Sequence, residues 1–155
     1  MSFTEDEKVL KKILNSIINS TAGVKYAVII DNSGISVLSQ SKFRINKDEA
    51  SVEKIGAIGG AVLMAGEEQG QILGYGNIDL QITEYERGIL FSMKIGKGIL
   101  CIATDLNVNI GFIRAIIKKW GPQLAKILDR YLEVDQEIIK EELKGLFNSS
   151  DTLTF

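Results

Sequence analysis

The sequence contains no histidine, so the commonest general base, the usual hydrolase triads and most zinc sites are excluded. Cys101 is the single cysteine, which excludes an internal disulfide and suits a reducing cytoplasm, where we expect the protein. No apolar run approaches the roughly 20 residues that cross a bilayer, and no direct membrane insertion is expected. The net charge of −2 does not favour nucleic acid. We expect no cofactor and no enzyme activity, although a site of carboxylates alone stays open.

The 155 residues are enough for one domain with a real core. Hydrophobic periodicity predicts the order α-β-β-α-β-β-β-α plus an extra C-terminal helix. The predicted helices are 4–21, 48–68, 107–131 and 134–147, and the predicted strands are 24–31, 35–41, 71–85, 89–95 and 99–105. Polar residues and two glycines in 71–85 are typical of an edge strand. A kink is expected at Gly121-Pro122. Residues 1–131 are predicted to form the domain, and residues 132–155 a helical extension and tail.

The central predicted helix contains the uncharged stretch IGAIGGAVLMAG, residues 55–66. A helix that is apolar all round is expected to be buried all round. Its bulky side should pack on the sheet; this side has Ile55, Ile58, Val62 and Leu63, with Gly59 and Gly66 between them. Its smooth side should meet a second copy in an antiparallel pair centred near Gly60 and Ala61, through Gly56, Ala57, Gly60, Ala61, Met64 and Ala65. The alternative is a helix buried within a monomer.

Glycine and single charged residues elsewhere favour structural roles. Gly74-Tyr75-Gly76 and Gly96-Lys97-Gly98 do not complete a GxGxxG phosphate loop and do not precede a helix, so hairpin turns are predicted. Cys101 lies inside ILCIAT and is predicted to be a buried structural thiol. Arg114 is expected to pair with a carboxylate or to cover the sheet, rather than to act as an arginine finger.

The order and spacing of several stretches, across about residues 5–131, resemble the Roadblock family, also called the dynein light-chain Roadblock family. The stretches are GVKYAVIIDNSGISVLS, IGAIGGAVLMAG, GYGNIDLQI…RGILFSMKI…GILCIATD and NVNIGFIRAIIKKW. The resemblance implies an α+β (α/β sandwich) fold with a five-stranded antiparallel sheet. The first and third helices would cover one face and the second helix the other. It also implies dimers joined through the second helix and the third strand, which adds Tyr75, Asn77 and Asp79 to the interface.

Members of that family are non-catalytic platforms that bind Ras-like small GTPases or link cargo to dynein, so we expect a dimeric adaptor for a small GTPase. The dimer would be a homodimer or a pair with a Roadblock paralogue. The candidate partner-binding rim is Glu53, Lys54, Glu67 and Glu68. One alternative is a structural dimerisation module without a nucleotide-dependent partner, and a less favoured one is a small-molecule sensor. The GTPase's identity, the choice among activator, exchange factor and inert anchor, and the role of residues 134–147 stay open.

Overall fold

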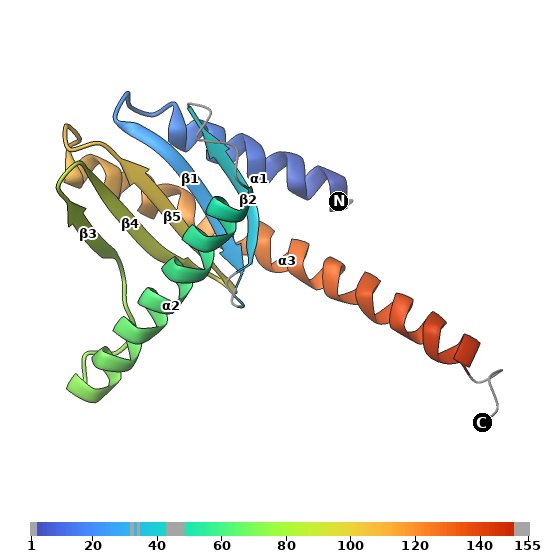
Figure 1. The fold of residues 1–155 in the computed structure, drawn as a ribbon. Helices are drawn as coiled ribbons and strands as arrows, with labels where there is room; N and C mark the ends of the chain where they lie inside the picture. Colours follow the sequence, from blue (N-terminus) through green and yellow to red (C-terminus); the bar gives the residue numbers. More distant parts are fainter. Residues whose placement is uncertain (1–2, 32, 34, 43–48, 151–155) are drawn as a thin grey trace.

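The computed structural model describes residues 3–31, 33, 35–42 and 49–150, without the side chains of 3–4, 36–37, 49–53, 134–136 and 147–150. Five antiparallel strands form one sheet in the order β2-β1-β5-β4-β3 (Figure 1). The strands are β1 (Val24–Asp31), β2 (Ser36–Ser41), β3 (Gln81–Tyr85), β4 (Gly88–Ile95) and β5 (Gly98–Thr104). The two edge strands, β2 and β3, are also the shortest.

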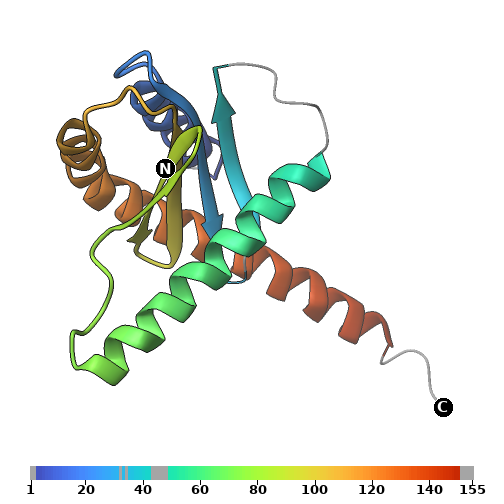
Figure 2. The same cartoon turned by 60° about the vertical axis from the view of Figure 1, so that its left-hand side comes forward.

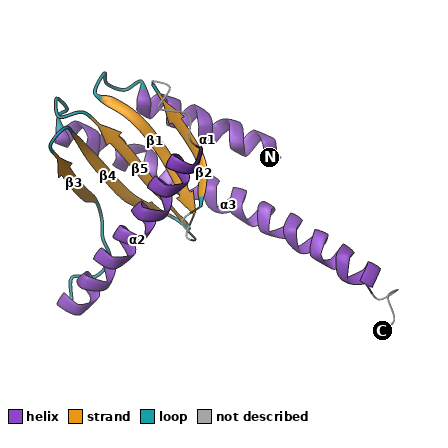
Figure 3. Ribbon diagram, viewed as in Figure 1, coloured by secondary structure: helices purple, strands orange, loops and turns teal. Residues whose placement is uncertain are grey.

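Three helices cover the two faces of the sheet, as Figures 2 and 3 show. Helices α1 (Phe3–Ile18) and α3 (Ile110–Ser150) pack on one face, and α2 (Glu49–Leu73) crosses the other. The arrangement confirms the predicted fold class, the order of elements and the distribution of helices.

Strand β1 shows why the sheet lies between two layers of helices. Ala27 and Ile29 belong to the larger core, which they share with α1 and α3, whereas Val28 and Ile30 belong to the core beneath α2. Successive side chains of a strand point to opposite faces, and the four residues are fully buried. A strand with apolar side chains on both faces needs cover on both, so β1 occupies a central position.

The prediction of a strand over 71–85 is wrong at its start. Helix α2 continues to Leu73, and β3 begins only at Gln81. Gly74 and Gly76 have φ values of 72° and 81°, and the Tyr75 N–H donates to the Gly70 carbonyl at 2.8 Å. Glycine in this left-handed conformation is a common helix terminator, so these two glycines end α2 rather than weaken a strand.

The prediction of two separate C-terminal helices is also wrong. Helix α3 is continuous over 41 residues and includes Pro122, and it leaves the domain as a long projection (Figure 1). Leu132 packs against the core, whereas Glu133 and residues 137–146 are exposed. Nothing in 131–134 breaks a helix, because YLEV contains neither glycine nor proline. The expected kink at Gly121-Pro122 stays a prediction.

Candidate interaction surface

Helix α2 contacts the sheet through a row of small residues. Gly59 lies so close to the sheet that an added Cβ would be 3.4 Å from Cys101 Sγ. One on Gly66 would be 3.1 Å from Gln81 Nε2 of β3 and 2.8 Å from Ile78 Cδ1 in the connection before β3. Leu63, on the same side of the helix, is fully buried, and Gly56 is buried as well. The sheet-facing row is therefore Gly56, Gly59, Leu63 and Gly66.

The prediction that the bulky side of α2 faces the sheet is confirmed for Gly59, Leu63 and Gly66 and is wrong for its other three bulky residues. Only Leu63 is buried, whereas Ile55, Ile58 and Val62 are 38%, 63% and 47% exposed. Because glycine has no side chain, the helix backbone lies close to the sheet along the sheet-facing row. The larger side chains are displaced to one side of that contact.

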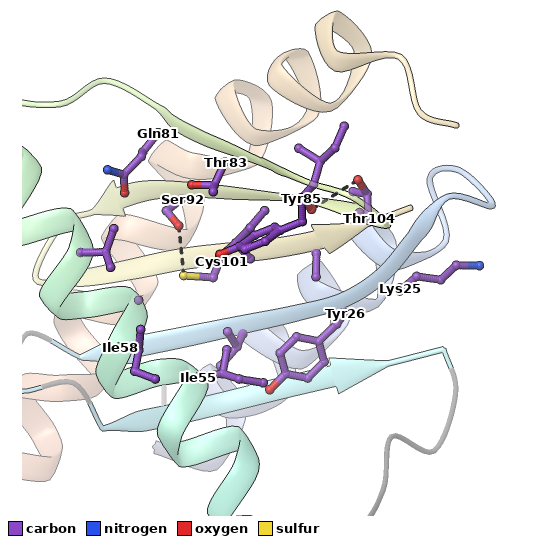
Figure 4. Close-up of a pocket in the computed structure, with 17 residues that line it drawn as sticks. Lys25, Tyr26, Ile55, Ile58, Gln81, Thr83, Tyr85, Ser92, Cys101 and Thr104 are labelled. Carbon is purple, nitrogen blue, oxygen red and sulfur yellow. Dashed lines mark hydrogen bonds between the residues drawn. The ribbon is translucent and has the colours of Figure 1, made fainter. Parts of the chain in front are cut away.

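The displaced side chains form one of two flanks of α2. We call Ile55, Ile58 and Val62 the β3 flank, because they line a cavity of about 510 Å³ together with Gln81, Thr83 and Tyr85 of β3. Figure 4 shows this cavity between α2 and the strands.

The other flank carries the small residues that the sequence assigned to a dimer face. We call Ala57, Gly60, Ala61 and Met64 the hairpin flank, because they line a depression of about 600 Å³ with Lys94 and the β4–β5 turn at 96–98. Ala57, Ala61, Met64 and Ala65 are exposed, whereas Gly60 is buried within the chain. The smooth face and β3 therefore lie on opposite flanks of α2, and the structure does not bring them together.

The residues expected from the third strand lie in the 74–80 connection instead. Tyr75 is 80% exposed. Asn77 Oδ1 accepts a hydrogen bond from Gln71 Nε2 at 3.2 Å. Asp79 Oδ2 lies 3.6 Å from Arg114 Nη2 and 3.1 Å from Lys118 Nζ, which confirms that Arg114 pairs with a carboxylate. Of the three, Tyr75 offers a large apolar surface.

The predicted rim divides in the structure. Lys54 and Glu68 are exposed on α2. Glu67 is only 16% exposed at its side chain and binds Lys94 of β4, with 2.8 Å between Oε2 and Nζ. Its other oxygen, Oε1, is buried and has no hydrogen-bond partner within the described part of the chain. The side chain of Glu53 lies outside the described residues.

Sequence reasoning missed an exposed apolar strip along α2 and β3. Besides Ile58 and Val62 it contains Ile72, Leu73 and Tyr85, which are 83%, 61% and 58% exposed. The signal that was available is the excess of apolar residues on α2: its sheet contact uses mostly glycines, so bulky residues remain for the surface.

The buried polar groups near α2 are suited to structure rather than to bond chemistry. Cys101 is 1% exposed, as predicted, and its Sγ lies 3.4 Å from Ser92 Oγ. Burial raises the pKa of the Cys101 thiol, while its hydrogen bond with Ser92 opposes that rise. The thiol therefore stays protonated at neutral pH, and a protonated thiol is a poor nucleophile.

Solved structures share this architecture. The gliding protein mglB from Thermus thermophilus matches with a TM-score of 0.72 at 17% identity, over 81% of this chain and 92% of that one. A Roadblock/LC7 domain from Streptomyces avermitilis matches with a TM-score of 0.65 at 15% identity, over 79% of this chain and 96% of that one. The chain has a Roadblock-type fold.

The chain also has relatives that are similar in sequence. The uncharacterized protein MJ0310 of Methanocaldococcus jannaschii is 29% identical over 102 residues, which are 66% of this chain and 85% of the relative. No family model matches the chain. Within the described ranges, no helix combines the length and the apolar character that a membrane span requires.

Proposed function

We propose that this Roadblock-type chain is a non-catalytic dimeric adaptor that binds a Ras-like small GTPase. The observation that carries the proposal is the apolar strip on α2 and β3, where Ile58, Ile72 and Leu73 are 63%, 83% and 61% exposed. Soluble monomers rarely expose a large contiguous apolar patch, and such patches mark protein interaction sites. The GTPase as the class of partner follows from the resemblance of the sequence to the Roadblock family.

The dimer contact is proposed on the β3 side of the molecule. β3 pairs with β4 alone among the described strands, so its outer edge is available for a second β3. A two-fold axis beside β3 would place the β3 flanks of two α2 helices against each other. With the centre near Gly60, Ile58 would meet Val62 of the partner subunit.

This proposal revises the interface expected from the sequence. Gly56 and Gly60 contribute little because they are buried in their own chain, and Asp79 is engaged by Arg114 and Lys118. Their place is taken by Ile58, Val62 and Tyr85, while Tyr75 is retained. Apolar side chains of this size contribute far more burial free energy than glycines do.

The hairpin flank then remains outside the dimer contact and is proposed to bind the GTPase. It presents Ala57, Ala61 and Met64 beside Lys94 and Lys97, both 47% exposed at their side chains. Lys54 and Glu68 of the predicted rim lie on the same helix. An effect on nucleotide hydrolysis would arise if the GTPase's own switch segments bound this surface in one conformation only.

The dimer is tested by native mass and sedimentation of the wild type and of Ile58→Glu. The wild type is expected at twice the 17.1 kDa chain mass, and the variant at the chain mass itself, because a buried glutamate would lack a partner. Ile138→Glu is the matched control, since Ile138 is 43% exposed on the projecting part of α3. A monomeric wild type, or a dimer that survives Ile58→Glu, would contradict the proposed interface.

The GTPase surface is tested separately with Ala61→Glu. This change on the hairpin flank should leave the dimer intact and weaken binding of the small GTPase at least tenfold. An unchanged affinity, with the dimer still present, would move the GTPase site elsewhere.

A further inference from the structure

The cavity beneath the β3 flank has the size of a small-molecule site. Its volume is about 510 Å³, and ligand pockets are typically about 300–1,000 Å³. Helix α2 crosses the sheet at a slant and leaves part of β4 and β5 uncovered (Figure 2). Ile55 and Ile58 overhang this uncovered part from one side, and Tyr85 of β3 borders it on the other (Figure 4).

The walls of the cavity are largely apolar and nearly free of charge. Leu90, Ala103 and Val28 supply strand surface, and the β3 flank supplies the rest. Among the described residues, Lys25 is the one charged residue in the lining, and its Nζ already lies 3.6 Å from Asp105 Oδ2. A charged ligand would lose its hydration here without gaining an opposite charge, so the lining selects an uncharged molecule.

Two residues of the cavity wall have buried hydroxyl groups, Tyr26 and Ser92. Tyr26 is 5% exposed, and its hydroxyl has no hydrogen-bond partner among the described residues. Burial raises the pKa of Tyr26; the Ser39 hydroxyl is near enough to oppose that rise, but the two are not in hydrogen-bond geometry. Ser92 is 4% exposed, and within the part of the chain that the structure describes its hydroxyl has only the Cys101 thiol, a weak partner, at 3.4 Å.

A buried hydroxyl without a partner is costly, which makes Tyr26 the most informative group in the cavity. Figure 4 shows its ring on the cavity wall with the hydroxyl beside Ile55. The hydroxyl is buried, so a ligand would reach it by moving the Ile55 side chain aside; its hydrogen-bonding group would then satisfy the hydroxyl while its apolar part fills the cavity.

We propose that this cavity binds an uncharged, largely apolar small molecule that carries a hydrogen-bonding group. The sequence did not favour this class of function, because the bulky side of α2 was expected to fill the space against the sheet. Because the sheet-facing row makes the contact, the β3 flank instead lines one side of a cavity. Binding here goes beyond the GTPase adaptor function. The cavity shares Ile58, Val62 and Tyr85 with the proposed dimer contact, so in the dimer the ligand would lie beneath that contact.

The proposal is tested with N-phenyl-1-naphthylamine, an uncharged fluorescent probe with a single N–H donor whose emission increases in apolar surroundings. The wild type should bind it saturably, with one probe per chain. Ala103→Phe places a ring inside the cavity and should weaken binding at least tenfold. Tyr26→Phe should weaken it about fivefold, the contribution of one hydrogen bond.

Controls separate the cavity from other apolar surface. Ala57→Phe adds the same ring on the hairpin flank and should leave the affinity within twofold. Circular dichroism and thermal unfolding show whether Ala103→Phe folds, and Thr83→Trp on β3 is the second filling variant. No saturable binding, or equal loss of binding in Ala57→Phe, would overturn the proposal.

The remaining outcome distinguishes this cavity from the dimer contact. If the dimeric wild type does not bind the probe but the monomeric Ile58→Glu variant does, the occupant is the second copy of the chain. That result would overturn the small-molecule proposal and leave the dimer standing. If the wild type is monomeric and binds the probe, the dimer proposal is overturned and the small-molecule proposal stands.

Discussion

Gly59 and Gly70 both lie on α2, and replacing each by alanine is predicted to change stability in opposite directions. Alanine removes the helix penalty of glycine, which is about 1 kcal/mol per residue. At position 59 the new methyl group would lie 3.4 Å from Cys101 Sγ and 3.7 Å from Ile30 Cδ1, which are tolerable contact distances. Gly59→Ala should therefore stabilise the protein by up to about 1 kcal/mol.

At position 70 the same methyl group would meet backbone. It would lie 2.5 Å from the carbonyl oxygen of Gly76, so the connection after α2 must move. Overpacking of this kind costs about 1–3 kcal/mol, which exceeds the gain in helix propensity. Gly70→Ala should lower the free energy of unfolding by about 1 kcal/mol.

The two variants are compared by urea and thermal unfolding at one protein concentration, because a dimer's apparent stability depends on concentration. Their unfolding midpoints should differ by about 4–8 °C in a domain of this size. Gly145→Ala on exposed α3 is the control, since nothing lies within 4 Å of its added Cβ, and only local helicity should rise. A change of the same sign at 59 and 70 would refute the account of how α2 is seated.

Three further predictions concern the core and the charged contacts. Leu63→Ala should destabilise the protein by about 2–4 kcal/mol in chemical unfolding, because Leu63 is fully buried beneath α2. Asp6 is 1% exposed and receives hydrogen bonds from Arg130 Nε and Nη2 at 2.9 and 2.6 Å, which lower its pKa below 3.8. This contribution is present above pH 3.8 and is lost as the pH falls through the lowered pKa; Asp6→Asn should flatten stability in that acidic window, and an unchanged acid limb in unfolding experiments would contradict it. Arg114→Ala should leave GTP hydrolysis by a bound GTPase within twofold, because Arg114 pairs with Asp79; a loss above a hundredfold would indicate an arginine finger.

The fold could be predicted from the sequence because its strongest signals are local. Strand β1 is apolar on both faces, which requires cover on both sides, and the turns on either side of β4 contain glycine. The end of α2 was missed because Gly74 and Gly76 are compatible both with a helix terminator and with an irregular edge strand. Their positive φ values decide the question, and a sequence does not contain them.

The orientation of α2 could not be predicted for a different reason. Gly59 and Gly66 lie among the bulky residues on one apolar side of the helix, so periodicity alone does not decide which of these residues lies nearest the sheet. The choice depends on the surface beneath, where Ile30 and Cys101 already fill the space under Gly59. The candidate site depends on that choice. In the structure Ile58 and Val62 are surface residues on the β3 side, and Ala57 and Ala61 line the depression beside the β4–β5 turn.

The most direct test of the adaptor function is binding of the wild type to small GTPases from the same cell, each loaded with GDP or with a non-hydrolysable GTP analogue. Surface-immobilised protein and a titration of each GTPase would give both affinities in one experiment. The account predicts that at least one GTPase binds. Tighter binding of one nucleotide state would indicate a regulator or effector, and equal binding of both states would indicate an inert anchor. Binding to none of them would contradict the account.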